Sequence, residues 1–161
     1  MDNSNNLYET DRFQWIEQQK QKFRNGQYDQ LDIENLFWEI EGMGSELGTL
    51  EHRLTTLILH LLKYDYQQRI INPLLPVPYL CRDWVKTIDR TRLAIDTLIN
   101  KNPHIKPHID DQITEAYPKA RRLAVREMNP YLQTHQQITE AVFPDTCPWR
   151  WKQLLNEDWL P

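Results

Sequence analysis

Apolar residues recur every three or four positions through residues 32–66, which is the spacing of one helix face and not the alternation of a strand. These positions are Ile33, Leu36, Phe37, Ile40, Met43, Leu47, Leu50, Leu54, Leu57, Ile58 and Leu61. At about 100° per residue, the two halves of the stripe have centres within roughly 40° of each other, so one uninterrupted helix would bury a continuous stripe. The sequence LTTLILHLLKY is apolar nearly all round, which is typical of a central helix. We therefore predict a long central helix over residues 32–66.

Glycines at positions 42, 44 and 48 leave the continuity of this helix open. Each glycine costs about 1 kcal/mol relative to alanine in a helix interior. The alternative to an uninterrupted helix is a kink or a short break near Gly44, with Ser45 capping a second helix. Asp32 is expected to cap the first half.

A helix is also expected before the central one. Thr10 or Asp11 can cap its start, and Gly26 stands where a glycine commonly ends a helix. Residues 1–9 before it are expected to form a frayed N-terminus.

Prolines separate the later helical patterns. Three of them in residues 69–81 predict an extended crossover, and a third helix is expected from about Asp83 to the sequence NKNP. A fourth follows from Ile109 to Asn129, with a kink or two abutting helices at Pro118. Residues 144–161 are expected to form a short aromatic tail helix that packs back on the bundle. The predicted fold is all-α, a bundle of about five to six helices.

Composition narrows the class of protein. The 161 residues, 40% of them hydrophobic and 26% charged, suit a single globular domain over residues 1–161. A net charge of -4 disfavours a general nucleic-acid binder. No apolar run reaches the length of a membrane span, and the start MDNSNN lacks the features of a signal peptide. We expect a cytoplasmic protein with Cys81 and Cys147 reduced.

Several segments, taken in order, resemble one known family. They are LYETDRFQWIEQQ, LDIENLFWEIEGMG, LILHLLKYDYQ, NPHIKPHI, EAYPKARRLA and FPDTCPWRWKQLLNEDWLP. Together they cover nearly the whole chain, which resembles the bacterial family catalogued as domain of unknown function number 29. The resemblance implies an all-helical fold and no assigned activity.

Carried over residue by residue, the polar positions of that family fall on Glu34, Glu39, Glu41, His60 and Arg121. The chain departs from the family in two places. Its crossover is more apolar and richer in proline than the usual arginine-rich connection, and Asp83 stands where the family has a small serine-like residue. A basic site in that connection is therefore not carried over to this chain.

Glu34 and Glu41 are seven positions apart, so they lie about 20° from each other on the predicted helix, beside Trp38. Paired carboxylates at a helix interface can bind a metal or act as acid and base. Seven residues span about 10.5 Å along a helix, too far for one ion without ligands from another helix. The alternative is that both carboxylates are solvated or paired with arginines.

His60 lies between apolar neighbours in LILHLLKY. A buried histidine needs partners for both ring nitrogens, and Glu34 or Glu41 could supply one if the chain folds back near Gly44. These three residues are therefore the candidate catalytic group, and His60 with Glu41 are the candidate metal ligands. The alternative is a structural histidine with its hydrogen bonds satisfied. Apart from this metal option, no cofactor is predicted.

His104 and His108 have the i, i+4 spacing of a helical metal pair. The neighbouring Pro103 and Pro107 oppose regular helix there. We predict a connection at this point.

Two further groups could bind a partner. Arg122 and Arg126 lie one turn apart and could grip a phosphate or an acidic partner, or form a solvated face paired with Glu115 and Glu127. Three tryptophans crowd the tail and could anchor a partner or a dimer, since large aromatics supply much of the binding energy in interfaces. They are Trp149, Trp151 and Trp159. The alternative for them is docking of the tail within the chain.

Two functions stay open from the sequence. Nucleophile elbows, P-loops, dinucleotide fingerprints and zinc-finger spacings are absent from it. We therefore favour a small protein-interaction module over an enzyme. Its partner would be a protein of unknown identity, with a homodimer as one option, and not a nucleic acid or a membrane. The alternative is a metal-dependent or acid–base enzyme that uses His60 with Glu34 and Glu41.

Overall fold

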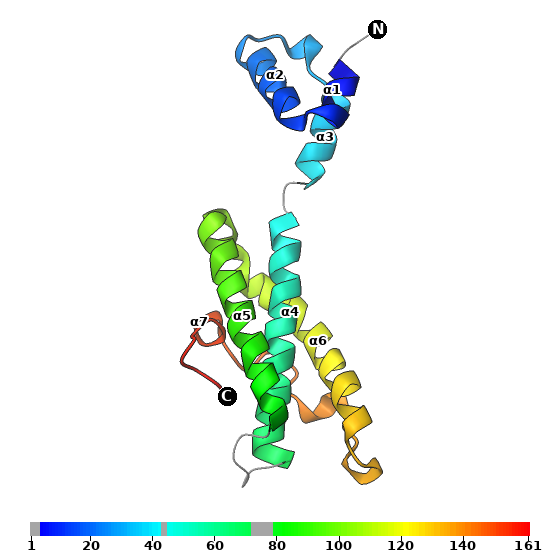
Figure 1. The fold of residues 1–161 in the computed structure, drawn as a ribbon, viewed down its shortest axis with the longest axis vertical. Helices are drawn as coiled ribbons and strands as arrows, with labels where there is room; N and C mark the ends of the chain where they lie inside the picture. The colour runs from blue at the N-terminus through cyan, green and yellow to red at the C-terminus, as the bar shows by residue number, and fades with distance from the viewer. Residues whose placement is uncertain (1–3, 43–44, 72–78) are drawn as a thin grey trace. The chain divides into compact units, whose positions relative to one another are not determined.

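The computed structural model describes residues 4–42, 45–71 and 79–161 (Figure 1). All regular elements of these residues are helical, which confirms the predicted all-α fold. The chain divides into two compact units, Met1–Gly44 and Ser45–Pro161. Two compact units can belong to one domain, so the single domain over residues 1–161 stays a prediction.

The N-terminal unit contains three α-helices. They are α1 (Ser4–Thr10), α2 (Arg12–Arg24) and α3 (Ile33–Gly42), with a 3-10 turn η1 (Tyr28–Gln30) between the last two. Residues 4–9, for which a frayed terminus was predicted, belong to α1.

The predicted ends of these helices follow from capping. The Asp11 carboxylate accepts the backbone N–H of Gln14 at 3.0 Å and caps α2. Gly26, just past the end of α2, has a φ of 70°, the left-handed conformation that favours glycine. The Asp32 carboxylate accepts the backbone N–H of Asn35 at 3.3 Å, as expected of a cap for α3.

Trp15 holds the N-terminal unit together, with only 1% of its surface exposed. Its indole N–H donates to the Asp32 carboxylate at 3.0 Å, and the ring of Tyr8 meets its own ring edge-on at 4.8 Å. The Gln19 side-chain oxygen accepts the backbone N–H of Asp32 at 2.9 Å. These contacts join α2 to the start of α3.

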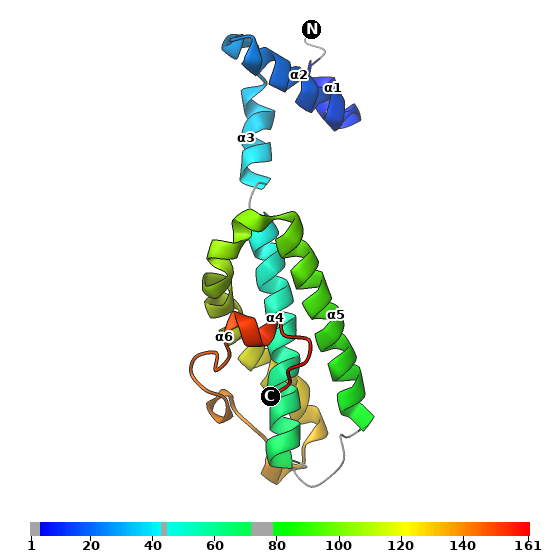
Figure 2. The same ribbon diagram turned by 90° about the vertical axis from the view of Figure 1, so that its left-hand side faces the viewer.

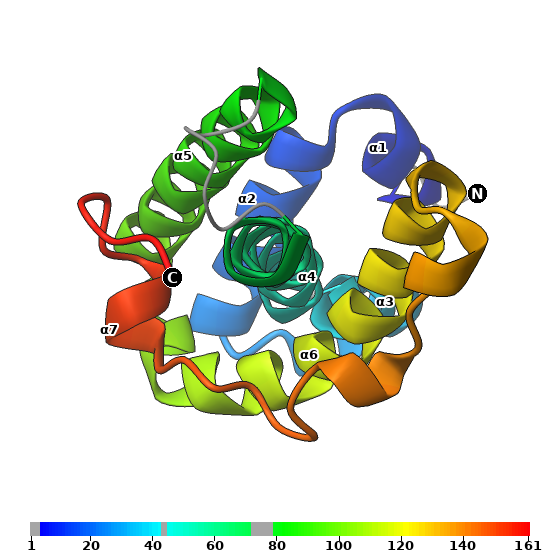
Figure 3. The ribbon, with the colours of Figure 1, turned by 90° about the horizontal axis from the view of Figure 1, so that it is seen from below.

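The C-terminal unit is a bundle around α4 (Ser45–Tyr66). Helices α5 (Tyr79–Lys101) and α6 (Ile109–Met128) pack on different sides of α4 (Figures 2 and 3). A π-helical turn, η2 (Gln67–Ile71), follows α4, and a 3-10 turn, η3 (Pro103–His108), joins α5 to α6. The predicted central role is confirmed for α4, whose LTTLILHLLKY sequence is almost wholly buried.

The predicted long helix over residues 32–66 corresponds to α3 and α4. Helix α3 ends at Gly42 in one unit and α4 begins at Ser45 in the other. The break predicted near Gly44 falls on residues 43 and 44, outside the described residues.

The later boundaries differ from prediction in detail. Helix α5 begins at Tyr79, four residues before the expected Asp83, and residues 72–78 of the predicted crossover lie outside the described residues. Helix α6 runs through Pro118 as one element, so the alternative of two abutting helices was wrong. His104 and His108 lie in the 3-10 turn that connects α5 and α6, as predicted.

The chain after α6 returns along the bundle. It forms 3-10 turns η4 (Asn129–Tyr131), η5 (Thr134–Gln136) and η6 (Glu140–Val142), and then the short α7 (Trp151–Leu154). Leu154 is fully buried in the core of the bundle, and its neighbours in the tail pack against that core. The predicted docking of the tail is confirmed, although its helix begins at Trp151 and not near Pro148.

Candidate functional site

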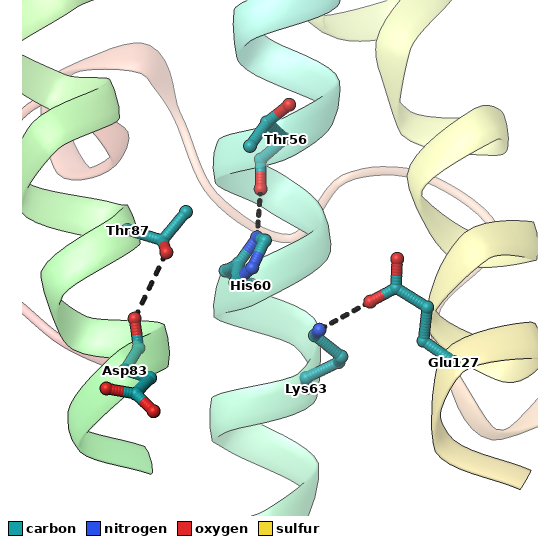
Figure 4. Close-up of polar contacts among 6 residues, drawn as sticks. All are labelled: Thr56, His60, Lys63, Asp83, Thr87 and Glu127. Atoms are coloured by element: carbon teal, nitrogen blue, oxygen red, sulfur yellow. Dashed lines mark hydrogen bonds and ion pairs between the residues drawn. The ribbon is translucent and has the colours of Figure 1, made fainter. Parts of the chain in front are cut away.

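His60 projects from α4 and is half-buried (Figure 4). Its Nδ1 lies 2.8 Å from the Thr56 carbonyl oxygen, one turn earlier. Because a carbonyl only accepts, Nδ1 carries the proton, and Nε2 keeps its lone pair in the neutral ring. Burial lowers the pKa of His60, against the opposing effect of the Thr56 carbonyl. The structure therefore favours a neutral histidine at physiological pH.

Lys63 was not predicted as a site residue, yet its side chain is only 7% exposed. Its ammonium lies 2.5 Å from the Glu127 carboxylate of α6 (Figure 4). The same ammonium lies 5.0 Å from the centre of the Trp84 ring. A buried ammonium needs such a partner to offset its desolvation. The one signal in the sequence was a charged residue inside the apolar run LILHLLKY.

A cavity of about 610 Å³ opens beside this ion pair. Lys63, Trp84, Glu127 and Met128 form part of its lining, together with residues of η2 and η4. His60 does not belong to the lining. The residues that share this cavity thus differ from the predicted catalytic group.

Glu34 and Glu41 are exposed on α3 of the N-terminal unit, whereas His60 belongs to the C-terminal unit. The predicted site of these three residues therefore draws on both units, and it stays a prediction. Within residues 4–42, 45–71 and 79–161, no three His, Cys, Asp or Glu side chains gather as a metal site would require. Metal binding by His60 and Glu41 likewise stays a prediction.

The tail tryptophans are used within the chain. Trp149 and Trp159 meet edge-on with ring centres 5.7 Å apart, and both pack against the core. The buried Arg92 guanidinium of α5 donates to the carbonyls of Leu154 and Trp159 at 2.7 and 2.8 Å. Trp151 keeps 38% of its surface exposed. Partner binding by these three tryptophans stays a prediction.

Arg122 and Arg126 are exposed on α6, and their role as partner-binding residues stays a prediction. Glu127, an expected ion-pair partner of this face, pairs with Lys63 instead. Arg121 turns toward the chain after α6, where it donates to the Glu140 carbonyl at 3.0 Å.

The largest departure from expectation is in the N-terminal unit. Its α3 was expected to bury an apolar stripe, but no residue of α3 is buried. We call the exposed apolar and aromatic side chains of this unit the N-terminal apolar surface. It comprises Phe13, Phe23, Tyr28, Ile33, Phe37, Trp38 and Ile40.

A groove of about 390 Å³ runs beside this surface, between α2 and α3. Its walls are mainly apolar, and its charged lining residues are Lys20, Arg24 and Glu39. The residues that line this α2–α3 groove are Trp15, Ile16, Gln19, Lys20, Phe23, Arg24, Leu31, Leu36 and Glu39.

One known family, described as Domain of unknown function DUF29, matches residues 7–160. The chain belongs to this family. The match spans both units, so the DUF29 domain includes the α2–α3 groove as well as the α4 bundle. No curated protein and no solved structure matches this DUF29 chain. No helix in the described part of the chain is long and apolar enough to cross a membrane.

Proposed function

We propose that this DUF29 protein is an interaction module whose N-terminal unit binds an amphipathic helix with acidic flanks on another protein. The observation that carries the proposal is the largely apolar α2–α3 groove, in which Phe23 is 62% exposed. Beside it, Ile33, Phe37 and Ile40 are exposed at 64%, 55% and 62% on a helix with no buried residue. Contiguous exposed apolar surface on a folded unit commonly marks a binding site. Keeping such side chains in water is unfavourable, and a partner that covers them removes that cost.

The shape of the α2–α3 groove supports a helical partner. Residues of both helices line the groove, and its apolar side chains include Trp15, Phe23 and Leu36. Amphipathic helices bind in such grooves through apolar anchors spaced by three or four residues. Aromatic side chains are the usual anchors of binding energy. A helix with an apolar stripe therefore fits both the chemistry and the form of this groove.

The charge of α2 supports acidic flanks on that helix. Within Arg12–Arg24 the sequence RFQWIEQQKQKFR has four cationic residues and one acidic one. Lys20 and Arg24 line the groove itself. Complementary charge at the rim of an interface speeds association and selects the partner. The preference is therefore for an acidic helix and against a basic one, even though the whole chain is acidic.

The test uses two synthetic helical peptides with the same leucine stripe, one flanked by glutamates and the other by lysines. Each is labelled with a fluorophore and titrated with the full chain while anisotropy is recorded. We expect the acidic peptide to bind at least about tenfold more tightly, because two rim charges each contribute a modest electrostatic preference. Phe23→Ala should weaken both peptides, and Lys20→Glu with Arg24→Glu should reverse the preference. Circular dichroism of each variant checks that the helices remain.

Equal binding of the two peptides, or no binding of either, would overturn the proposal. Sedimentation of the chain alone supplies a further outcome. If it dimerises and Phe37→Ser abolishes the dimer, the surface is occupied by a second copy and not by another protein. The matched control is Leu93→Ser, which removes an exposed apolar side chain from α5 of the other unit.

The alternative function is a metal-dependent or acid–base enzyme using His60, Glu34 and Glu41. In such an enzyme His60 could bind a metal or accept a proton only with the lone pair on Nε2, since Nδ1 donates to the Thr56 carbonyl. Stoichiometric metal in the purified chain, lost in His60→Ala, would favour the enzyme over the interaction module. We expect the module to act in the cytoplasm of a bacterial cell, as the sequence and the family resemblance predict.

A further inference from the structure

A second groove, between α4 and α5, has a chemistry that the proposed function does not use. This α4–α5 groove has a volume of about 340 Å³. The residues that line it are His52, Arg53, Thr56, Thr87, Arg90, Thr91 and Ala94. No acidic residue is among them, although acidic residues outnumber lysine and arginine by 23 to 19 in the chain. The groove is therefore a local cationic site on an acidic protein.

Arg53 is fixed in this groove by a bond between the two helices. Its Nη1 donates to the Ala94 carbonyl of α5 at 2.7 Å. A guanidinium has five N–H donors in a planar fork, and this bond uses one of them. The remaining donors of a half-buried guanidinium that is already oriented lose little entropy when an anion accepts from them.

Arg90 stands on α5, one turn before Ala94, and His52 stands on α4 beside Arg53. Both side chains are exposed, and neither has a hydrogen bond or an ion pair with any residue that the structure describes. The two helices thus bring one oriented and one unpaired guanidinium to the same groove, with an imidazole next to them.

Two of the threonines that line this groove use their hydroxyls within their own helices. Thr56 donates its hydroxyl to the His52 carbonyl at 3.2 Å, and Thr87 donates to the Asp83 carbonyl at 3.1 Å (Figure 4). Both hydroxyls are therefore turned to their own helices, and the donors that remain for a ligand in the lining are the cationic side chains and the hydroxyl of Thr91. Paired guanidinium groups match the geometry and charge of phosphate oxygens.

We propose that the α4–α5 groove binds the phosphate group of a small phosphorylated molecule, held by Arg53 and Arg90 with His52 beside them. The site lies in the C-terminal unit, so it is independent of the α2–α3 groove. Its size suits a phosphate group and a small substituent.

The test is a titration of the ¹⁵N-labelled full chain with inorganic phosphate, followed by amide chemical shifts at constant ionic strength. We expect saturable shifts confined to residues of α4 and α5 around the groove. Arg90→Gln should weaken binding about tenfold, since it removes a charged hydrogen bond. The matched control is Lys101→Gln, which removes one positive charge from the same helix outside the groove and should change the affinity less than twofold. Arg53→Gln should also weaken binding, with its fold checked by circular dichroism.

A parallel titration with glycerol phosphate separates the sources of the ligand. Tighter binding of the ester supports a phosphorylated small molecule, and equal binding supports free phosphate in the same site. Absence of saturation at about 20 mM phosphate would overturn the proposal, and so would an equal loss in Lys101→Gln and Arg90→Gln. Binding of a single-stranded oligonucleotide without binding of phosphate would also overturn it, in favour of a nucleic-acid surface.

Discussion

The two units of this protein use the same kind of apolar helix in opposite ways. In the C-terminal unit, α4 is covered by α5 and α6, and its Leu50, Leu57 and Leu61 are fully buried. In the N-terminal unit, α3 carries Ile33, Phe37 and Ile40 at similar spacing, and all three are exposed. The spacing of apolar residues defines which face of a helix must be covered, but it does not define what covers it.

This difference predicts two kinds of response to mutation. Loss of an apolar side chain from the α4 bundle removes core packing and lowers stability. Loss of an apolar side chain from the N-terminal apolar surface should leave stability unchanged and remove binding. Substitutions in the two units therefore separate folding from function. The four substitutions below are ordered from the largest expected loss of stability to the smallest.

Leu57→Ala should have the largest effect on stability. Leu57 is fully buried in the core of the bundle, and such truncations cost about 2–5 kcal/mol through lost burial and the cavity that remains. Urea unfolding followed by circular dichroism measures the loss. Leu93→Ala, at an exposed position of α5, is the control and should cost less than about 0.5 kcal/mol. Similar losses at both positions would contradict the assignment of the core to α4.

Arg92→Met should cost about 2–3 kcal/mol, because it removes charged hydrogen bonds to two tail carbonyls while keeping an apolar stem. Hydrogen exchange of the tail amides should rise at the same time, since Arg92 fixes residues near Leu154 and Trp159. An exposed arginine of α6, Arg126, provides the control as Arg126→Met. Unchanged exchange in the Arg92 variant would mean that packing alone holds the tail.

Tyr117→Phe should cost about 1 kcal/mol at neutral pH, because the Tyr117 hydroxyl donates to the Pro144 carbonyl at 2.6 Å. Burial raises the pKa of Tyr117 from 10.0 to about 12. The folded state thus prefers the protonated phenol. The stability that comes from this preference is complete below pH 10 and is lost as the pH rises toward 12. The difference in unfolding free energy between the wild type and Tyr117→Phe should shrink over that range, and a constant difference would contradict the assignment.

Phe37→Ser should have the smallest effect on stability, within about 0.5 kcal/mol, because the ring is mostly exposed on α3. It should nevertheless reduce binding of the acidic peptide. Thermal unfolding and the anisotropy titration on one preparation measure both effects. A large loss of stability would show that Phe37 belongs to a core.

Local rules of the sequence accounted for much of the fold. Asp11 and Asp32 cap the helices as predicted, and Gly26 takes the left-handed conformation expected after a helix. Helix α6 also has nearly the predicted span, because it ends at Met128, just before Asn129 and Pro130. These features depend on residues within one or two turns of each other, so the sequence alone is sufficient.

Partners far apart in the chain were not predictable in this way. Lys63 pairs with Glu127, and Arg92 bonds to Leu154 and Trp159, each across more than sixty positions. A helical period places such side chains on a face but does not select the acceptor. The exposure of α3 was missed for a related reason, since its stripe is in phase with that of α4 and was assigned to the same core.

The most direct test of the central claim is photo-crosslinking in the cell from benzoylphenylalanine placed at position 23, on the α2–α3 groove. We expect an adduct that maps to an amphipathic helix with acidic flanks on another protein, and that disappears when Lys20 and Arg24 are both changed to glutamate. An adduct that maps only to residues 45–161 of the same chain would contradict it, because the N-terminal apolar surface would then be covered from within the protein.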